Sequence, residues 1–246
     1  MEEKTKNFLF SSVGDNTNFD SIWNGSNMNY DIYVIYYGDN ETNYNRYKSK
    51  VKFIEKRQGS KFQNFKYFYE KYIDIINNYD RFFILDDDII INVNDINSMF
   101  DISRKYNLDI CGPSFSFDSK LTYTFTRHKR KVLLTYTNFV EVGVPLFNRI
   151  ALDKLMEKLT YELIGWGIDF LYIYCNGLEK KTSYAIIHKI ICKNPRDKEK
   201  KNPVRELNNI KNCDQRGKIW DTFAKKNGMK DFKRLEYQNI YLTDAI

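Results

Sequence analysis

The sequence lacks the features of a membrane-spanning or secreted protein. No stretch approaches the roughly 18 consecutive apolar residues that a transmembrane helix requires. The first residues, MEEKTKNFLF, contain acids where a signal peptide has bases, and their apolar run is too short for one. We therefore expect a cytoplasmic protein.

Cysteine and histidine are scarce. The 4 cysteines lie far apart with no Cys-x-x-Cys pair, which argues against a zinc site and a disulfide framework and fits a reducing compartment. Of the 2 histidines, His128 lies in a basic stretch and His188 in an apolar run, where a histidine is more often a core residue than a metal ligand. The P-loop pattern Gly-x-x-x-x-Gly-Lys-Ser/Thr is also absent, which disfavours that class of nucleotide enzyme.

Apolar and basic residues are abundant. With 246 residues, of which 42% are hydrophobic and 16% aromatic, the chain can bury a sizeable core. The net charge of +7 comes largely from two clusters, RHKRK (127–131) and the lysine-rich stretch 193–205. These clusters are either solvated loops or a surface that attracts an anionic partner. They lack the interleaved aromatic residues of a nucleic-acid-binding surface.

Strand and helix patterns alternate over the first 115 residues. Strands are predicted at 7–13, 30–39, 82–85 and 108–112, and helices at 62–76 and 95–106. Such alternation predicts an α/β fold whose mixed, mostly parallel sheet has helices on both faces. Ligands of such sheets bind outside the carboxyl ends of the strands.

The second half has a different pattern. Two antiparallel strands, 120–126 and 131–142, are predicted on either side of the basic stretch 127–131. A helix at 149–160, a strand at 183–191 and a helix at 219–226 are predicted to follow. We expect residues 1–192 to form the catalytic core and residues 193–246 a basic extension packed on the same domain.

The most unusual stretch is RFFILDDDIIIN (81–92), in which three aspartates interrupt an apolar run. In a strand, Asp86 and Asp88 would project to one side and Asp87 to the other. Two such charges about 4 Å apart repel by roughly 4 kcal/mol at an effective dielectric near 20. A chain tolerates this repulsion if a cation lies between the two carboxylates or if one of them is protonated. The aspartates could instead cap the next helix, but Asn92 and Asn94 are closer to its start. A metal or nucleotide site is therefore favoured.

The residue types indicate which metal. Paired carboxylates suit Mg²⁺ or Mn²⁺, and these ions keep positions open for substrate phosphates. A histidine ligand would favour Mn²⁺. In a basic protein, this pattern predicts chemistry on a diphosphate, with the ion as a Lewis acid.

A second unusual stretch is GWGID (165–169). Its two glycines permit a close backbone approach or a positive φ. Asp169 is either the N-cap of a helix or a general base, and Trp166 offers a flat face on which a sugar ring can stack.

These stretches together resemble the GT-A class of nucleotide-sugar glycosyltransferases. FFILDDD is similar to the apolar strand and Asp-x-Asp of that class, and GWGID is similar to a Gly-Trp-Gly…Asp segment of several inverting members. The segments GSKFQNFKYF, YDRFFILDDDI, TNFVEVGVPLFNR and GWGIDF, in this order, resemble a family of GT-A-like proteins from plants, bacteria and large DNA viruses. The resemblance covers about residues 7–192, and it allows for a viral protein made in a host cell.

The resemblance implies roles for ten positions. The implied roles are sugar-donor binding by Gly14, Asp15, Lys61, Asp86 and Asp87, metal binding by Asp86, Asp88 and His188, catalysis by Asp169, and acceptor binding by Glu141 and Trp166. The implied activity is metal-dependent transfer of a sugar from a nucleoside diphosphate such as UDP to a glycan hydroxyl. The implied cofactor is Mn²⁺ or Mg²⁺, and inversion would follow from Asp169 acting as base.

Two other functions remain open from the residues alone. One is a metal-dependent phospho- or nucleotidyltransferase, and the other is a non-enzymatic nucleic-acid-binding protein that uses the basic clusters. The residues also leave a retaining mechanism open.

Overall fold

The computed structural model of the chain describes residues 6–17, 19–196, 199 and 209–242. The α-helices are α1 (Phe19–Ile22), α2 (Glu41–Lys48), α3 (Lys61–Lys71), α4 (Ile73–Ile76), α5 (Val93–Lys105), α6 (Arg149–Lys158), α7 (Ile168–Asn176) and α8 (Arg216–Lys226), with short 3₁₀ helices η1 (Thr124–Thr126) and η4 (Cys213–Gln215). The strands are β1 (Asn7–Val13), β2 (Asp31–Tyr36), β3 (Phe53–Lys56), β4 (Arg81–Asp86), β5 (Ile110–Phe115), β6 (Val132–Thr137), β7 (Leu146–Asn148), β8 (Tyr184–Cys192) and β9 (Glu236–Tyr241).

The described strands form one nine-stranded mixed sheet in the order β3-β2-β1-β4-β7-β5-β8-β6-β9. Strands β3, β2, β1 and β4 are all parallel, and β5 is parallel to β8. The short β7 runs antiparallel to its neighbours β4 and β5, and β6 runs antiparallel to β8 and β9. The predicted mixed α/β sheet with a parallel core is therefore confirmed.

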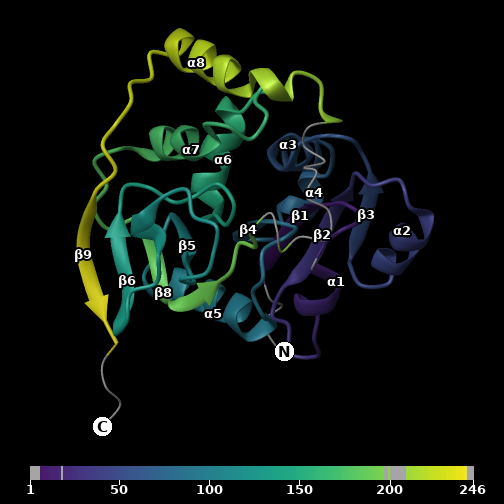
Figure 1. Cartoon of the computed structure of the whole chain (residues 1–246), viewed down its shortest axis with the longest axis horizontal. Helices are drawn as coiled ribbons and strands as arrows, with labels where there is room; N and C mark the ends of the chain where they lie inside the picture. Colours follow the sequence, from purple (N-terminus) through teal and green to yellow (C-terminus); the bar gives the residue numbers. More distant parts are fainter. Residues whose placement is uncertain (1–5, 18, 197–198, 200–208, 243–246) are drawn as a thin grey trace.

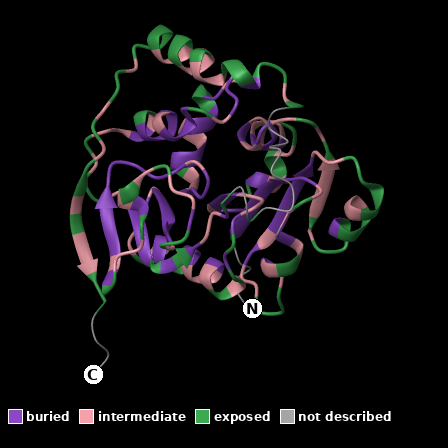
Figure 2. Cartoon of the chain, viewed as in Figure 1, coloured by how far each residue is buried: buried purple, intermediate pink, exposed green. Residues whose placement is uncertain are grey.

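Helices cover both faces of the sheet, because successive strand residues alternate between two apolar clusters. Leu9, Phe83 and Leu85 pack against α1, α2 and α5, whereas Phe8, Phe82 and Ile84 pack against α3, α4, α6 and α7. Figure 1 shows these two helical layers, with α8 lying across the second one and β9 along the edge of the sheet. Figure 2 shows that burial is concentrated in the central strands and decreases toward α2, α8 and β9.

The second half of the chain departs from the prediction. The predicted strand at 120–126 is wrong: the segment contains η1, and the rings of Tyr123 and Phe125 pack on Phe139 at centroid distances of 4.8 and 6.0 Å. The alternating aromatic pattern thus reflects ring packing, not strand pairing. The strand predicted at 131–142 ends at Thr137, and residues 138–145 form a loop.

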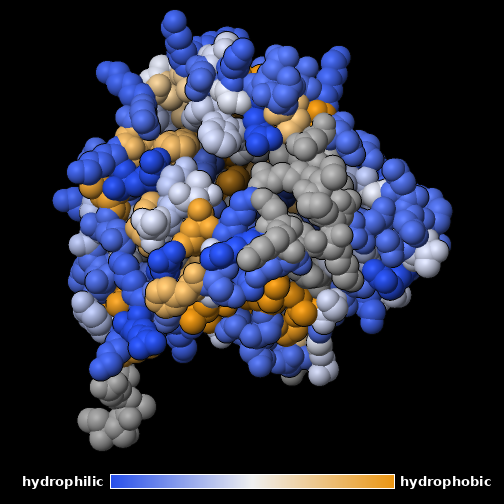
Figure 3. All heavy atoms as spheres, in the orientation of Figure 1, coloured by the Kyte–Doolittle hydropathy of each residue, from blue (hydrophilic) through white to orange (hydrophobic). Residues whose placement is uncertain are grey.

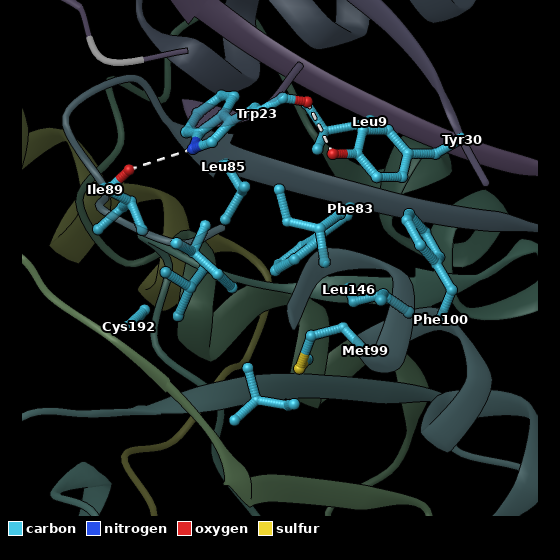
Figure 4. Packing of buried hydrophobic residues seen from close by; sticks show 14 of the residues in the cluster. Leu9, Trp23, Tyr30, Phe83, Leu85, Ile89, Met99, Phe100, Leu146 and Cys192 are labelled. Atoms are coloured by element: carbon cyan, nitrogen blue, oxygen red, sulfur yellow. Dashed lines mark hydrogen bonds between the residues drawn. The ribbon is translucent and has the colours of Figure 1, made fainter. Parts of the chain in front are cut away.

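The segment after β4 is held in place by hydrogen bonds from the apolar cluster that packs against α1, α2 and α5. The indole N–H of Trp23 donates to the carbonyl of Ile89 (3.2 Å), and the Tyr30 hydroxyl donates to the carbonyl of Trp23 (2.7 Å), as Figure 4 shows. Ile90 then pairs with Lys193 in an isolated antiparallel bridge, with both N–H···O distances at 2.9 Å. The turn that carries the aspartates is therefore fixed on its apolar side.

The described helices are all too short or too polar to cross a lipid bilayer. Figure 3 shows a face on which hydrophilic residues predominate and apolar residues occur in separate patches.

Candidate active site

The strand register places the two N-terminal candidate segments at the same edge of the sheet. Ser12 of β1 is the partner of Asp86 in β4, and the strands run parallel. Gly14 and Asp15, which follow β1, therefore lie at the same carboxyl edge as the three aspartates. This edge is where parallel sheets bind ligands.

Asp87 ties the two strand ends together. The predicted alternation of side chains assumed that all three aspartates lie in the strand. Strand β4 instead ends at Asp86, and Asp87 and Asp88 lie in the turn that follows. The Asp87 carboxylate accepts hydrogen bonds from the Gly14 N–H (2.9 Å) and the Tyr37 hydroxyl (3.1 Å). The next helix is capped by Asn92, whose side chain accepts from the Asp95 N–H at 3.0 Å. Helix capping by the aspartates is thereby excluded.

Asp86 is paired with a shielded lysine. The Lys61 ammonium lies 2.8 Å from the Asp86 carboxylate, and it also donates to the carbonyls of Val142 (2.6 Å) and Ile84 (3.2 Å). On the other side, a Cβ at Gly143 would be 3.2 Å from the same carboxylate, so the backbone of Gly143 approaches it closely. Lys61 therefore balances the charge of Asp86 and fixes the loop 138–145 against the end of β4.

Asp15 is held in its charged form by neighbouring hydrogen-bond donors. Burial alone would raise the pKa of Asp15, but hydrogen bonds from the Tyr36 hydroxyl, the Asn43 amide and the Asp39 N–H outweigh it and lower the pKa. A charged, preorganised carboxylate thus lies at the end of β1.

Glu141 is a buried carboxyl group with incomplete hydrogen bonding. It lies in the loop 138–145, which Tyr172 holds through a hydrogen bond to the carbonyl of Val140. The Thr122 hydroxyl donates to Oε1 (3.1 Å), whereas Oε2 has no partner in the described part of the chain. Burial, reinforced by the charges of Asp169 and Asp86, raises the pKa of Glu141 to about 7.

Asp169 is the second buried carboxyl group. It is the second residue of α7, whose first turn begins after Gly167 with φ of 80°. Its carboxylate accepts from the Phe170 N–H (3.1 Å). Burial raises the pKa of Asp169 to about 7, although this hydrogen bond and the positive charge of Arg234 oppose the shift. A carboxyl group with this pKa can exchange a proton near neutral pH.

The glycines around Trp166 do what their pattern predicted. Both have positive φ, 75° at Gly165 and 80° at Gly167. Gly167 also permits a close approach, because a Cβ there would lie 2.0 Å from the Trp220 ring of α8. Trp166 itself, three positions before Asp169, is 55% exposed.

The structure does not bring His188 to the aspartates. Its Nδ1 accepts from the Lys129 N–H (3.2 Å), so the neutral ring donates from Nε2 to the Thr135 hydroxyl (3.0 Å). Burial, with the nearby charges of Lys129 and His128, lowers the pKa of His188 to about 3. Both ring nitrogens are therefore occupied, and the predicted role of His188 as a metal ligand gains no support from this geometry.

The described residues contain no group of three or more His, Cys, Asp or Glu side chains placed to share a metal ion. Proteins commonly hold Mg²⁺ or Mn²⁺ through one or two carboxylates while the substrate's phosphates supply other ligands. The predicted metal role of Asp86, which ends β4, and of Asp88, which lies in the turn after it, stays a prediction.

Arg234 was missed by sequence analysis. It precedes β9, and its guanidinium lies over the rings of Tyr123, Phe139 and Phe170, at 4.6, 5.5 and 5.5 Å from their centroids. Its charge acts on Asp169. The three rings come from three separate segments, so no local pattern could reveal this contact.

The sequence matches the family described as "Protein of unknown function (DUF707)" over residues 2–234. None of the curated proteins matches it. Among solved structures, the chain is similar to S. aureus TarS 1-349, with 7% identity, a TM-score of 0.56, and coverage of 78% of this chain and 60% of that one. A longer S. aureus TarS structure gives 6% identity, a TM-score of 0.52 and coverage of 78% and 37%.

The chain thus spans less than two thirds of either TarS chain. A candidate nucleotide-diphospho-sugar transferase from Desulfovibrio desulfuricans G20 is similar at 8% identity over 69% of this chain and 74% of that one, but its TM-score of 0.40 is too low to bear on the fold. At these identities the similarity to TarS shows the fold alone, which is a GT-A-like α/β fold.

Proposed function

We propose a function for this chain, which belongs to the DUF707 family of proteins of unknown function. It is a metal-dependent glycosyltransferase that moves a sugar from a nucleoside diphosphate to a hydroxyl group. The transfer inverts the configuration at the anomeric carbon. UDP-sugars are the first donors to test. The supporting observation is that Asp86 lies at the carboxyl edge of a GT-A-like sheet and donates its N–H to the carbonyl of Gly143, in the loop that carries Glu141. Asp86 ends β4, and its charge acts on Glu141, which in turn interacts with Asp169.

The strand-end residues would hold the sugar donor. Asp86 and Asp88 would bind Mn²⁺ or Mg²⁺, which supplies Lewis-acid stabilisation of charge on the leaving diphosphate. Asp15 and the Gly14 backbone, both at the end of β1, would contact the nucleoside. Asp87 would position that segment through its hydrogen bond to the Gly14 N–H. Lys61 would keep Asp86 oriented through their ion pair.

Asp169 would act as the general base. In its ionised form it takes the proton of the acceptor hydroxyl as that oxygen forms a bond to the anomeric carbon. The bond from the anomeric carbon to the diphosphate oxygen breaks on the opposite face, so the configuration inverts. The proton stays on Asp169 until the product leaves. Glu141 would accept or donate a hydrogen bond at the acceptor, and the exposed Trp166 would stack on its sugar ring.

A product assay tests this function. The protein is incubated with a panel of UDP-, GDP- and dTDP-sugars and Mn²⁺, with and without mixed saccharide acceptors, and the nucleotide products are separated. Release of nucleoside diphosphate is expected for one donor, and omission of the metal is expected to abolish it. Formation of pyrophosphate or a nucleoside monophosphate would contradict the proposal and would favour the nucleotidyl- or phosphotransferase alternative.

A further inference from the structure

A surface hollow of about 630 Å³ lies near Asp169, since two of its lining residues, Phe232 and Arg234, contact the ring of the next residue, Phe170. Two segments line it, residues 122–125 before β6 and residues 231–234 before β9. The first segment also carries Thr122, which holds Glu141. The hollow therefore adjoins both buried acids, and its second wall comes from the C-terminal part of the chain.

The apolar part of the lining is aromatic. Tyr123 and Phe125 come from the first segment and Phe232 from the second. Behind them, the Phe170 ring contacts Phe139 and Phe232 at centroid distances of 5.4 and 5.5 Å. Aromatic faces of this kind suit the C–H faces of a sugar or polyol.

The polar part of the lining is mainly cationic. Lys233 and Arg234 are opposed by one exposed carboxylate, Asp231, which accepts from the Phe232 N–H at 2.9 Å. Within the described part of the chain, the contacts of the Arg234 guanidinium are ring faces, and no carboxylate or carbonyl there accepts a hydrogen bond from it. A guanidinium fixed by rings keeps its N–H groups oriented for a planar or tetrahedral anion.

We propose that this hollow is the acceptor site, and that it selects a saccharide or polyol bearing an acidic group, a carboxylate or a phosphate, that pairs with Arg234. This proposal rests on the proposed transfer reaction, because it assigns the acceptor of that reaction. The acidic group meets Arg234 while a neighbouring hydroxyl of the same molecule faces Asp169.

The position of Arg234 favours the acceptor over the sugar donor. Lys61 and the strand-end aspartates lie together at the ends of β1 and β4, whereas Arg234 acts on Asp169 and comes from the segment before β9. Glu141 is influenced by the charges of both Asp86 and Asp169. Arg234 therefore comes from a different part of the candidate site than the residues proposed to hold the diphosphate.

Isothermal titration without metal or nucleotide tests the proposal. The probes are methyl β-D-glucuronide for a carboxylate, glucose 6-phosphate for a phosphate, and methyl β-D-glucoside as the neutral reference. At least one acidic probe is expected to bind about tenfold or more tightly than the neutral one, as a charge-assisted bidentate pair requires. Equal binding of all three probes, or no measurable binding of the acidic ones, would overturn the proposal.

Two variants show whether Arg234 causes the preference. Arg234→Gln is expected to abolish it, while Lys233→Gln, a matched loss of charge at the neighbouring position, is expected to reduce it by less than about threefold because Lys233 is exposed. If Arg234→Gln does not fold, Arg234→Lys replaces it and is expected to lower the preference at least about threefold through loss of the planar fork. A preference that survives these changes at Arg234 contradicts the proposal.

The two proposals fail separately in this design. A protein that prefers the acidic probe but releases no nucleoside diphosphate from any sugar nucleotide would contradict the glycosyltransferase. A protein that releases nucleoside diphosphate but shows no acid preference would contradict the acidic acceptor alone.

Discussion

The two sides of the candidate site differ in the number of hydrogen-bond donors that surround their carboxyl groups. On one side is the strand-end group, Asp15, Asp86 and Asp87, whose carboxylates receive N–H, O–H or ammonium donors. On the other is the buried acid pair, Glu141 and Asp169, which has few donors and pKa values near 7. The strand-end group is built to keep negative charge, and the buried acid pair is built to exchange a proton.

This difference shows that the position of each acid relative to the sheet determines how well its charged form is stabilised. Parallel strand ends supply backbone N–H groups and side chains from adjacent strands, so a carboxylate there is stabilised without leaving solvent. Glu141 and Asp169 lie under the loop 138–145 and at the first turn of α7, where desolvation disfavours the charged form. Under the proposed function, the charge for a metal and diphosphate would thereby be separated from the base for a hydroxyl within one site.

The largest expected effect comes from removing the base. Asp169→Asn is expected to lower kcat by about 10²–10⁴-fold, the range typical of general bases, because the amide cannot take the proton. Binding of UDP with Mn²⁺, measured by titration calorimetry, is expected to stay unchanged. The matched control is Asp221→Asn, at an exposed acid on α8. A normal kcat in Asp169→Asn would show that Asp169 is not the general base, and the proposed difference in role between the two groups of acids would be wrong.

The same substitution is expected to change stability in a pH-dependent way. Between the usual pKa of 3.8 and the folded pKa of about 7, the folded protein holds a proton on Asp169 that the unfolded chain has lost. The free energy of unfolding of the wild type therefore falls as pH rises through this window and levels off above it. The free energy of unfolding of Asp169→Asn minus that of the wild type is therefore expected to increase by on the order of 3 kcal/mol from pH 4 to pH 8.

Chemical denaturation at several pH values measures this difference. Asp221→Asn again serves as the reference, since it changes the same groups at an exposed position. A stability difference between Asp169→Asn and the wild type that does not vary with pH would show that Asp169 is ionised in the folded protein throughout this range.

The strand-end group gives the next effect. Asp87→Ala is expected to lower the free energy of unfolding by about 1–3 kcal/mol, because the Gly14 N–H and the Tyr37 hydroxyl lose their acceptor. Tyr37→Phe, which removes one of these donors and keeps the carboxylate, is expected to lose less. Thermal denaturation compares the two variants. An unchanged free energy of unfolding in Asp87→Ala would mean that the hydrogen bonds of Asp87 do not stabilise the contact between the ends of β1 and β4.

The smallest expected effect concerns the coupling within the buried acid pair. The rate constant kcat/KM is expected to rise with pH and to level off above an apparent pKa near 7, which belongs to the pair. Glu141→Gln removes a like charge, so it is expected to move this midpoint to lower pH by less than about one unit. An unchanged midpoint would mean that the two acids titrate independently.

Local patterns predicted the parts of the fold and site that depend on local contacts. The run before Asp86 predicted a buried strand because each of its residues packs on one face or the other, and β4 is that strand. The pattern GWGID predicted positive φ at its glycines and a nearby helix start, and both are present. The alternative that Asp169 is the N-cap is wrong, because α7 begins at Ile168 and its N-cap is Gly167.

Long-range pairing explains what sequence analysis missed. Strand β9 has the sequence EYQNIY, which is half polar, and it is a strand because β6 offers an open edge. The three-residue β7 is defined only by its neighbours β4 and β5. The domain prediction, in which residues 193–246 form a basic extension packed on the same domain, stays a prediction. In the described part of this segment, β9 pairs with β6 at the edge of the sheet, and the charge of Arg234 acts on Asp169.

Titration of UDP against the protein with and without Mn²⁺ tests the central claim most directly, with Asp88→Ala compared to Asp221→Ala. The account predicts that Mn²⁺ strengthens UDP binding at least about tenfold in the wild type and in Asp221→Ala, and that Asp88→Ala loses this gain, as expected when a carboxylate bridges the protein to a metal-bound diphosphate. Equal affinity with and without Mn²⁺, or an undiminished gain in Asp88→Ala, would contradict it.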